Sequence, residues 1–289
     1  MSNRREATTV RHRRGFTLIE LLVSFVIGLI VLGAVVQTMI VQGKGYRKQR
    51  EQVDVRETTR EAVALLSWDL RQAAVAGSPF VTMSPNNVTI RSPRGLGTIC
   101  ARAALVAGIQ PPRFGLWKTA GNIQATVDDT ALVYQMGTGK WLKAKITAVG
   151  TPAAMGVAAC AWPGARAPDI VVEFGNATAT DLATIRTGAP FRNFRSVQYA
   201  EFQQSGRWWL GRKVGQAASW EQLTGPLLAP ASNGLAFTYY DTLGVVSADL
   251  NAIGKVAVTV RTESYKNATS GSTFVYQRDS LTTVVGVRR

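Results

Sequence analysis

Histidine is almost absent from this chain of 289 residues: His12 is the only one, and it lies in an arginine-rich amino-terminal leader. If the leader is removed, no imidazole remains, which takes Ser-His and Cys-His catalysis and most zinc sites out of consideration. Only two cysteines are present, Cys100 and Cys160, too few for a tetrahedral metal site. In an exported domain such a pair favours one disulfide, although their spacing neither supports nor excludes it.

Other chemical signatures are missing as well. We find no glycine-rich phosphate loop, no cluster of metal ligands and no close pair of carboxylates on a recognisable scaffold. We therefore expect no enzymatic activity, no cofactor and no bound metal. Acids are also scarce, with 18 Asp and Glu against 33 Lys and Arg and a net charge of +15. Such a charge would attract nucleic acid, anionic lipid or an acidic partner, and its plainer interpretation is a solvated basic surface.

One long apolar run follows the leader. From Leu21 to Val36 the only polar side chain is Ser24, and the run from Phe16 to Val41 is long enough to cross a membrane as a helix. The residues around 33–37 form no convincing cleavage site of an ordinary signal peptide, although a weak one stays open. Bases flank the run on both sides, so the charge rule leaves its orientation undecided.

Glu20 stands inside this run, where a carboxylate costs at least ~2.5–3.5 kcal/mol and so marks a functional site. A basic leader ending in Gly15, followed by Phe16-Thr17-Leu18-Ile19-Glu20 and a membrane-length helix, resembles the type III signal of type IV pilins and type II secretion pseudopilins. The resemblance implies cleavage between Gly15 and Phe16 by a prepilin peptidase on the cytoplasmic side. It also implies N-methylation of Phe16 and retention of the apolar run.

The same resemblance supplies a partner for Glu20. In these families the equivalent glutamate pairs with the N-terminal amine of a neighbouring subunit, here the amine created on Phe16 by cleavage. A buried pair offsets the desolvation that each charge would otherwise suffer. The alternative is local, because Glu20 also lies one turn from its own helix terminus and is stabilised there by the helix dipole.

The residues after the run form an amphipathic helix. Apolar and small side chains recur at intervals of three and four on one face, which predicts a helix packed against a sheet. Glycine, serine and proline at 77–79 supply a stop signal, and Gly43 and Gly45 could loosen the helix midway. The stripe consists of Val55, Thr59, Ala62, Leu66, Leu70 and Ala73.

Beyond Pro79 the pattern predicts strands, with turns at 204–206 and 241–244. Gly95–Gly121 is the least readable stretch and is interpreted as an insertion or loop. The fold class is therefore α+β, a long amino-terminal helix packed on an antiparallel β-sheet head. The predicted strands are Val88–Arg91, Ala131–Gln135, Trp141–Ala148, Ile170–Phe174, Arg195–Gln203, Arg207–Lys213, Leu235–Asp241, Lys255–Thr262 and Thr273–Arg278.

The chain divides into four predicted segments: a cleaved leader (1–15), a transmembrane or filament-core helix (16–41), an amphipathic helix (42–77) and an exported β-rich head (78–289). In the head, Gly234-Leu235 followed by Phe237, Tyr239-Tyr240-Asp241 and Gly244 resembles PilW-type minor pilins and J-type minor pseudopilins, as does the stretch around Asp69-Leu70-Arg71. Major pilins usually carry a proline in the outer half of the apolar run, and its absence here favours a minor subunit.

The resemblance implies a minor pilin that helps to start, assemble or cap a type IV pilus. A minor pseudopilin of a type II secretion system is the alternative. The implied partners are other minor and major pilins and the prepilin peptidase. The implied location is the inner membrane with the head in the periplasm, and then the filament at the cell surface.

A binding subunit at the pilus tip, which captures DNA or a surface, is the other hypothesis. One stretch alternates bases and aromatics as single-strand binders do. The competing interpretation is a hairpin with buried tryptophans and solvated arginines, and DNA as a partner stays unproven. The residues concerned are Arg207, Trp208, Trp209, Arg212 and Lys213.

Overall fold

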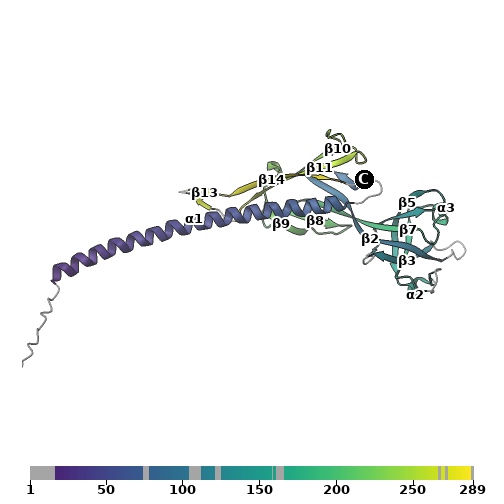
Figure 1. Cartoon of the computed structure of the whole chain (residues 1–289), viewed down its shortest axis with the longest axis horizontal. Coiled ribbons are helices and arrows are strands. Elements are labelled where there is room, and N and C mark those ends of the chain that lie inside the picture. The colour runs from purple at the N-terminus through teal and green to yellow at the C-terminus, as the bar shows by residue number, and fades with distance from the viewer. Residues whose placement is uncertain are drawn as a thin grey trace, which may run out of the picture.

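The computed structural model describes residues 17–73, 78–103, 112–120, 125–157, 159–160, 166–265, 268–270 and 273–287. One helix, α1 (Leu18–Gln72), carries a β-rich head on its second half, and its first half extends away from the head (Figure 1). This is the predicted α+β architecture. The helix passes through Gly43 and Gly45 without interruption, and residues 74–77, where its end was predicted, lie outside the described part.

The head is a twelve-stranded antiparallel sheet with a separate two-stranded ribbon. Its described connections include two short α-helices, α2 (Pro152–Met155) and α3 (Ala179–Ala183), and a 3₁₀ helix, η1 (Pro230–Ser232). The order is β1-β2-β3-β6-β5-β4-β7-β8-β9-β11-β10, and β14 pairs with β11. The strands are β1 (Phe80–Met83), β2 (Asn87–Ala103), β3 (Arg113–Ala120), β4 (Thr130–Gln135), β5 (Lys140–Gly150), β6 (Ile170–Gly175), β7 (Pro190–Gln204), β8 (Arg207–Val214), β9 (Glu221–Leu227), β10 (Leu235–Asp241), β11 (Ile253–Glu263) and β14 (Arg278–Gly286), and the ribbon is β12 (Ala268–Ser270) with β13 (Thr273–Val275).

Six strands close into a barrel at the end of the head farthest from the free half of α1 (Figure 1). The ring runs β2-β3-β6-β5-β4-β7, and pairing of β2 with β7 closes it. Closure leaves no sheet edge within the ring, and side chains fill the interior of so small a barrel. The buried apolar residues there are Ile99, Phe114, Leu116, Ala125, Ala131, Val133, Ala144, Ile146, Val172, Phe174, Leu182, Ile185, Ala189 and Phe191.

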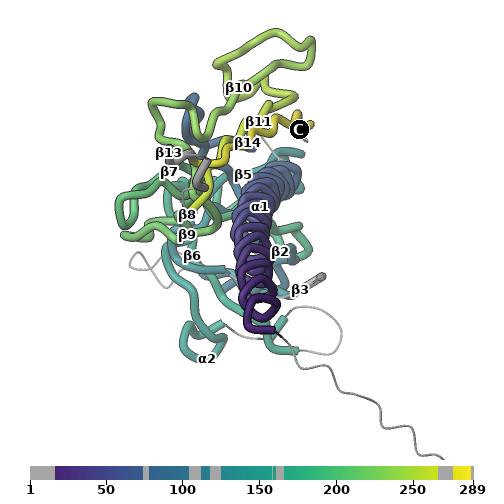
Figure 2. The backbone as a smooth tube through the Cα atoms, turned by 90° about the vertical axis from the view of Figure 1, so that its left-hand side faces the viewer, coloured from purple at the N-terminus to yellow at the C-terminus, as the bar shows by residue number. Residues whose placement is uncertain are grey.

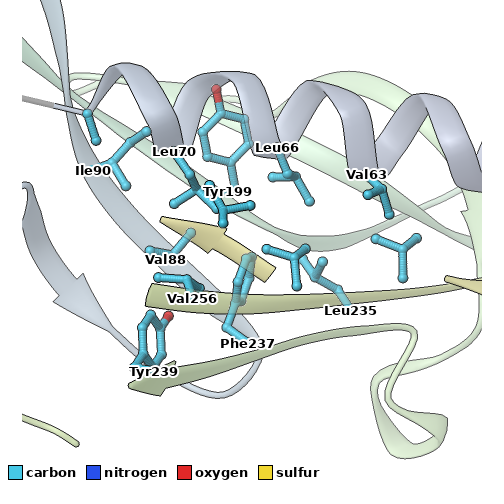
Figure 3. Close-up of a cluster of buried hydrophobic side chains, with 14 of the residues drawn as sticks. Val63, Leu66, Leu70, Val88, Ile90, Tyr199, Leu235, Phe237, Tyr239 and Val256 are labelled. Atoms are coloured by element: carbon cyan, nitrogen blue, oxygen red, sulfur yellow. The ribbon is translucent and has the colours of Figure 1, made fainter. Parts of the chain in front are cut away.

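The second core lies between α1 and the sheet (Figure 3). Every member of the predicted helix stripe is buried, from Val55 with 3% of its surface exposed to Leu70 with none. Their partners include Val256, Val258 and Val260, which alternate along β11 and so share one face of the sheet. The predicted packing of the helix on a sheet is confirmed.

Two short turns lie where the sequence predicts them. Ser205 and Gly206 join β7 to β8, both with positive φ, as two-residue hairpin turns require. The turn from Asp241 to Gly244 begins the segment between β10 and β11, which projects from the head (Figure 2). At its tip the side chain of Leu243 is 88% exposed.

Two predictions about strands are wrong. Gly95–Gly121 is not a loop in its described part, because β2 continues to Ala103 and β3 begins at Arg113. Glycines in this stretch suggest turns. At Gly115, however, glycine permits close packing within a strand, because a Cβ there would lie 2.6 Å from the Pro168 side chain. Thr273–Arg278 is not one strand but the end of the ribbon and the first residue of β14.

Candidate functional site

The first half of α1 is an apolar surface that the head does not cover. Its most apolar stretch has a mean hydropathy of 2.7 and none of it is buried. The large apolar side chains between Leu18 and Val41 are 45% to 83% exposed. In water such a surface is unfavourable, so lipid or other apolar helices must cover it.

Glu20 lies in the first turn of this helix. Thr17 caps the turn, since its hydroxyl accepts a hydrogen bond from the Glu20 backbone N–H at 3.4 Å. The Glu20 carboxylate has no hydrogen bond or ion pair with any residue that the structure describes. The backbone carbonyl of Glu20 accepts a hydrogen bond from the Ser24 hydroxyl at 2.8 Å. Gly15 and Phe16 lie outside the described residues, so their predicted processing stays a prediction. Among the described residues, then, nothing neutralises the Glu20 carboxylate, and a cation from another chain could do so.

Polar contacts fix the second half of α1 to the head. The buried hydroxyls of Thr59 and Thr262 are 2.5 Å apart, which ties the helix to β11. The Thr224 hydroxyl donates to Glu61 at 3.1 Å, which ties it to β9. The Asp69 carboxylate accepts a hydrogen bond from the Tyr199 hydroxyl, and burial together with this bond raises the pKa of Tyr199. These side chains set how the head sits on the helix.

The predicted nucleic-acid contacts all lie on or next to β8, but they do not form one surface. Neighbouring residues of a strand point to opposite faces, so Trp208 and Trp209 are separated. Trp208 packs on the helix-side core, and the Trp209 indole N–H donates to the Gln204 carbonyl at 3.3 Å. This differs from both sequence interpretations, because neither tryptophan is fully buried and they do not share a face.

The bases of the same strand are engaged within the head. Two nitrogens of Arg212 donate to the two carboxylate oxygens of Glu221, each at 3.0 Å. Lys213 lies 4.8 Å from the centre of the Trp220 ring. Arg207 lies 4.8 Å from the centre of the Tyr265 ring. Binding of DNA here would compete with these contacts, and it stays a prediction.

Cys100 and Cys160 come together in the distal barrel. A disulfide joins them, with an S–S distance of 2.09 Å and Cα atoms 4.7 Å apart. Both cysteines are buried in a small apolar cluster with Met155 and Val171. The bond links the end of β2 to the segment before β6.

Sequence reasoning missed a basic and aromatic surface on this barrel. Arg192 of β7 and Lys143 of β5 both pair with Leu132 of β4, which places them on one face. The guanidinium of Arg192 lies 5.2 Å from the centre of the Trp141 ring, and Tyr134 contacts Trp141 edge-on. Three strands supply these side chains, so no single stretch of sequence signals the surface.

The charge on this face is only partly balanced. Burial and the nearby Arg91 lower the pKa of Lys143. Lys145 on the same strand is paired with Asp128 at 2.6 Å. Within the described residues, no group of three or more histidines, cysteines or acids lies close enough to hold a metal ion.

Residues 10–36 match the family model of the prokaryotic N-terminal methylation motif. No curated protein and no solved structure matches the chain. The matched segment spans the end of the leader, the predicted cleavage site and the first part of the uncovered helix. A methylation motif at the start of a long apolar helix that carries a β-sheet head supports a type IV pilin-like protein.

Proposed function

We propose that the chain is a minor pilin of a type IV pilus, acting in initiation, assembly or capping of the filament. The observation that carries the proposal is the uncovered apolar half of α1, which overlaps the methylation motif. Lipid covers this surface before assembly, and the apolar helices of other pilins cover it in the filament. The proposal assigns no catalytic step, cofactor or metal to the chain.

The maturation that goes with this role begins at the membrane. A prepilin peptidase cleaves between Gly15 and Phe16 and the new amine of Phe16 is methylated. The head then lies in the periplasm, and assembly moves the subunit into the filament at the cell surface. There Glu20 meets the Phe16 amine of a neighbouring subunit and sets the register of the two helices.

Mass spectrometry of the membrane-extracted protein tests the maturation step. We expect a mature chain that begins at methylated Phe16, and a Gly15→Val variant that keeps its leader. Deletion of the protein should lower the number of pili per cell more than their length, because an initiating subunit is needed once per filament. An amino terminus near Val35 would mean ordinary signal-peptide cleavage and contradict the proposal.

A minor pseudopilin of a type II secretion system is the alternative, because the motif and the helix serve both systems. Deletion of the protein in the cell that makes it distinguishes the two roles. Loss of surface pili with normal protein secretion favours the pilus, and the opposite result favours the secretion system.

A second candidate function is binding of a nucleic acid by the distal barrel. The surface around Trp141 combines an aromatic ring with the cations of Arg192 and Lys143, as single-strand binding surfaces do. It also lies at the end of the head far from the apolar helix, where a filament tip would expose it (Figure 1).

Retention of a fluorescent single-stranded oligonucleotide by the full chain, measured against salt, tests this function. Arg192→Gln with Lys143→Gln should lower retention, whereas Arg207→Gln with Lys213→Gln, the matched pair on β8, should change it little. The reverse result would indicate that the oligonucleotide binds at β8 and not at the distal barrel. Equal loss in both double variants would indicate diffuse attraction to the basic head.

A further inference from the structure

A cleft lies between α1 and the head where the helix leaves it. Its volume is about 960 Å³, and one wall is the helix from Lys44 to Thr58. The opposite wall consists of the β9 residues Gly225 and Pro226, the end of β11, and Tyr265. In Figure 1 this is the end of the head beside β13, from which the free half of α1 extends. The cleft therefore faces the apolar part of the helix.

Along the helix wall of the cleft, the basic residues come before the acidic residues. Lys44, Arg47 and Lys48 lie on one face of the helix by their spacing, at the end of the cleft nearest the apolar run. No acid of the described residues lies within 4.0 Å of the charged atoms of these three bases or of Arg50, which also lines the cleft. Within the described part of the chain, these three neighbouring cations therefore have no ion-pair partner.

On the helix wall the acids of the cleft, Glu51 and Asp54, begin about one turn after the bases, and Glu263 at the end of β11 also lines the cleft and lies 3.9 Å from Arg278. Glu51 follows the bases, and its Oε2 atom is buried without a hydrogen-bond partner in the described part of the chain. A buried carboxylate oxygen is expected to accept a hydrogen bond. A ligand with a phosphate at the bases and a hydroxyl about 5 Å further in would supply both missing contacts.

The position of the cleft relative to the membrane indicates that such a ligand is a lipid headgroup. A hydrocarbon layer of ~30 Å takes up about 20 residues of helix, and the uncovered apolar stretch runs from Leu18 to Val41. Lys44 to Lys48 then fall in the layer of lipid headgroups. Tyr46, between these bases on the helix, is 69% exposed, and exposed aromatic side chains favour the membrane interface.

We propose that this cleft binds the headgroup of an anionic phospholipid of the phosphatidylglycerol class. Lys44, Arg47 and Lys48 contact the phosphate, and Glu51 accepts a hydrogen bond from a headgroup hydroxyl. The inference rests on the membrane placement of α1 and not on the pilus role. It also supplies a counter-charge for the basic cluster that follows the apolar run, because Lys and Arg form charge-assisted hydrogen bonds with phosphate.

Native mass spectrometry of the full chain in neutral detergent tests the proposal. The protein is titrated with dioleoyl phosphatidylglycerol, with dioleoyl phosphatidylcholine and with soluble glycerol 3-phosphate. We expect one phosphatidylglycerol per chain at a concentration at least tenfold lower than phosphatidylcholine requires, and no comparable binding of glycerol 3-phosphate. Changing Lys44, Arg47 and Lys48 together to Gln should remove the preference.

The matched control changes Arg56, Arg60 and Arg71 to Gln, which removes the same charge from exposed positions of the same helix. This variant should keep the preference, and so should Arg47→Lys, which retains the charge. Circular dichroism verifies that each variant is folded.

Three outcomes would overturn the proposal. Equal loss in both triple variants would mean diffuse attraction, and no preference in the wild type would mean no lipid site. Saturation by glycerol 3-phosphate would mean a site for free phosphate esters. None of these outcomes bears on leader cleavage or filament formation, so the proposed pilus role is tested separately.

Discussion

The two halves of α1 form one continuous helix but obtain their packing from different sources. In the second half, Leu66 and Leu70 are fully buried against the sheet of the same chain. In the first half, Leu29 is 52% exposed and nothing in the described chain covers its neighbours. The comparison shows that the second half of α1 and the head complete one core within the chain, whereas the apolar half leaves its surface to be covered by lipid or by other subunits.

The largest effect on the head should come from removing the disulfide. Changing Cys100 and Cys160 to Ser should lower the free energy of unfolding by ~3–5 kcal/mol, because the bond restricts a long loop in the unfolded chain. Urea denaturation of the detergent-solubilised protein measures this change. If both thiols of the unreduced, unfolded wild type react with an alkylating reagent, the bond does not exist in the exported protein.

The two halves of α1 can be compared directly with one substitution in each. Leu66→Ala should cost about 2–5 kcal/mol of head stability, since it leaves a cavity in a packed core. Leu29→Ala removes the same atoms from a side chain that contacts no part of the head, so head unfolding should not change. Urea denaturation followed by tryptophan fluorescence measures both. Similar losses in the two variants would contradict the division of the helix.

A smaller effect should appear as a dependence of head stability on pH. Burial raises the pKa of Glu201 to about 7 from an ordinary 4.5, although a hydrogen bond from the Leu235 N–H opposes the shift. The folded state therefore holds this proton more tightly than the unfolded state. Its contribution is complete below pH 4.5 and is lost as the pH rises through 7, on the order of 1–2 kcal/mol after allowance for solvent screening.

Urea midpoints at pH 4.5 and pH 8 test this dependence. Glu201→Gln keeps an acceptor for Leu235 but does not titrate, so the part of the pH dependence that Glu201 contributes should disappear. Glu57→Gln, at an exposed position of α1, should leave the wild-type dependence intact. An unchanged dependence in Glu201→Gln would mean that other groups cause it.

The sequence predicts the helix-side core well because the signal is local. The stripe from Val55 to Ala73 repeats with the helical period, and the period alone defines its buried face. Most strands of the head were predicted as well, since β-branched and aromatic residues cluster in them. The sequence also indicates the residues predicted to direct processing and assembly, because Gly15, Phe16 and Glu20 lie together beside the apolar run and inside the segment that matches the methylation motif.

The distal barrel was less predictable because its structure depends on contacts between distant segments. β3 lies in a stretch rich in glycine and alanine, and it becomes a strand through pairing with β2 and β6 on either side. The engagement of Arg212 by Glu221 and the gathering of Arg192, Lys143 and Trp141 likewise depend on strand register. Their spacing in the sequence carries no sign of these contacts.

The most direct test of the comparison is whether the uncovered half of α1 is completed by another subunit through Glu20. Glu20→Gln keeps the size of the side chain but removes the anion that would meet the Phe16 amine of a neighbour. Loss of one side of a buried ion pair costs ~3–5 kcal/mol, which is two orders of magnitude or more in an assembly equilibrium. The measurement is the amount of protein in membrane and sheared-filament fractions, with Glu57→Gln as the control for removal of one acid from the same helix. The account predicts that Glu20→Gln is cleaved and inserted but almost absent from filaments, whereas entry into filaments at the wild-type level would show that Glu20 serves only its own helix terminus.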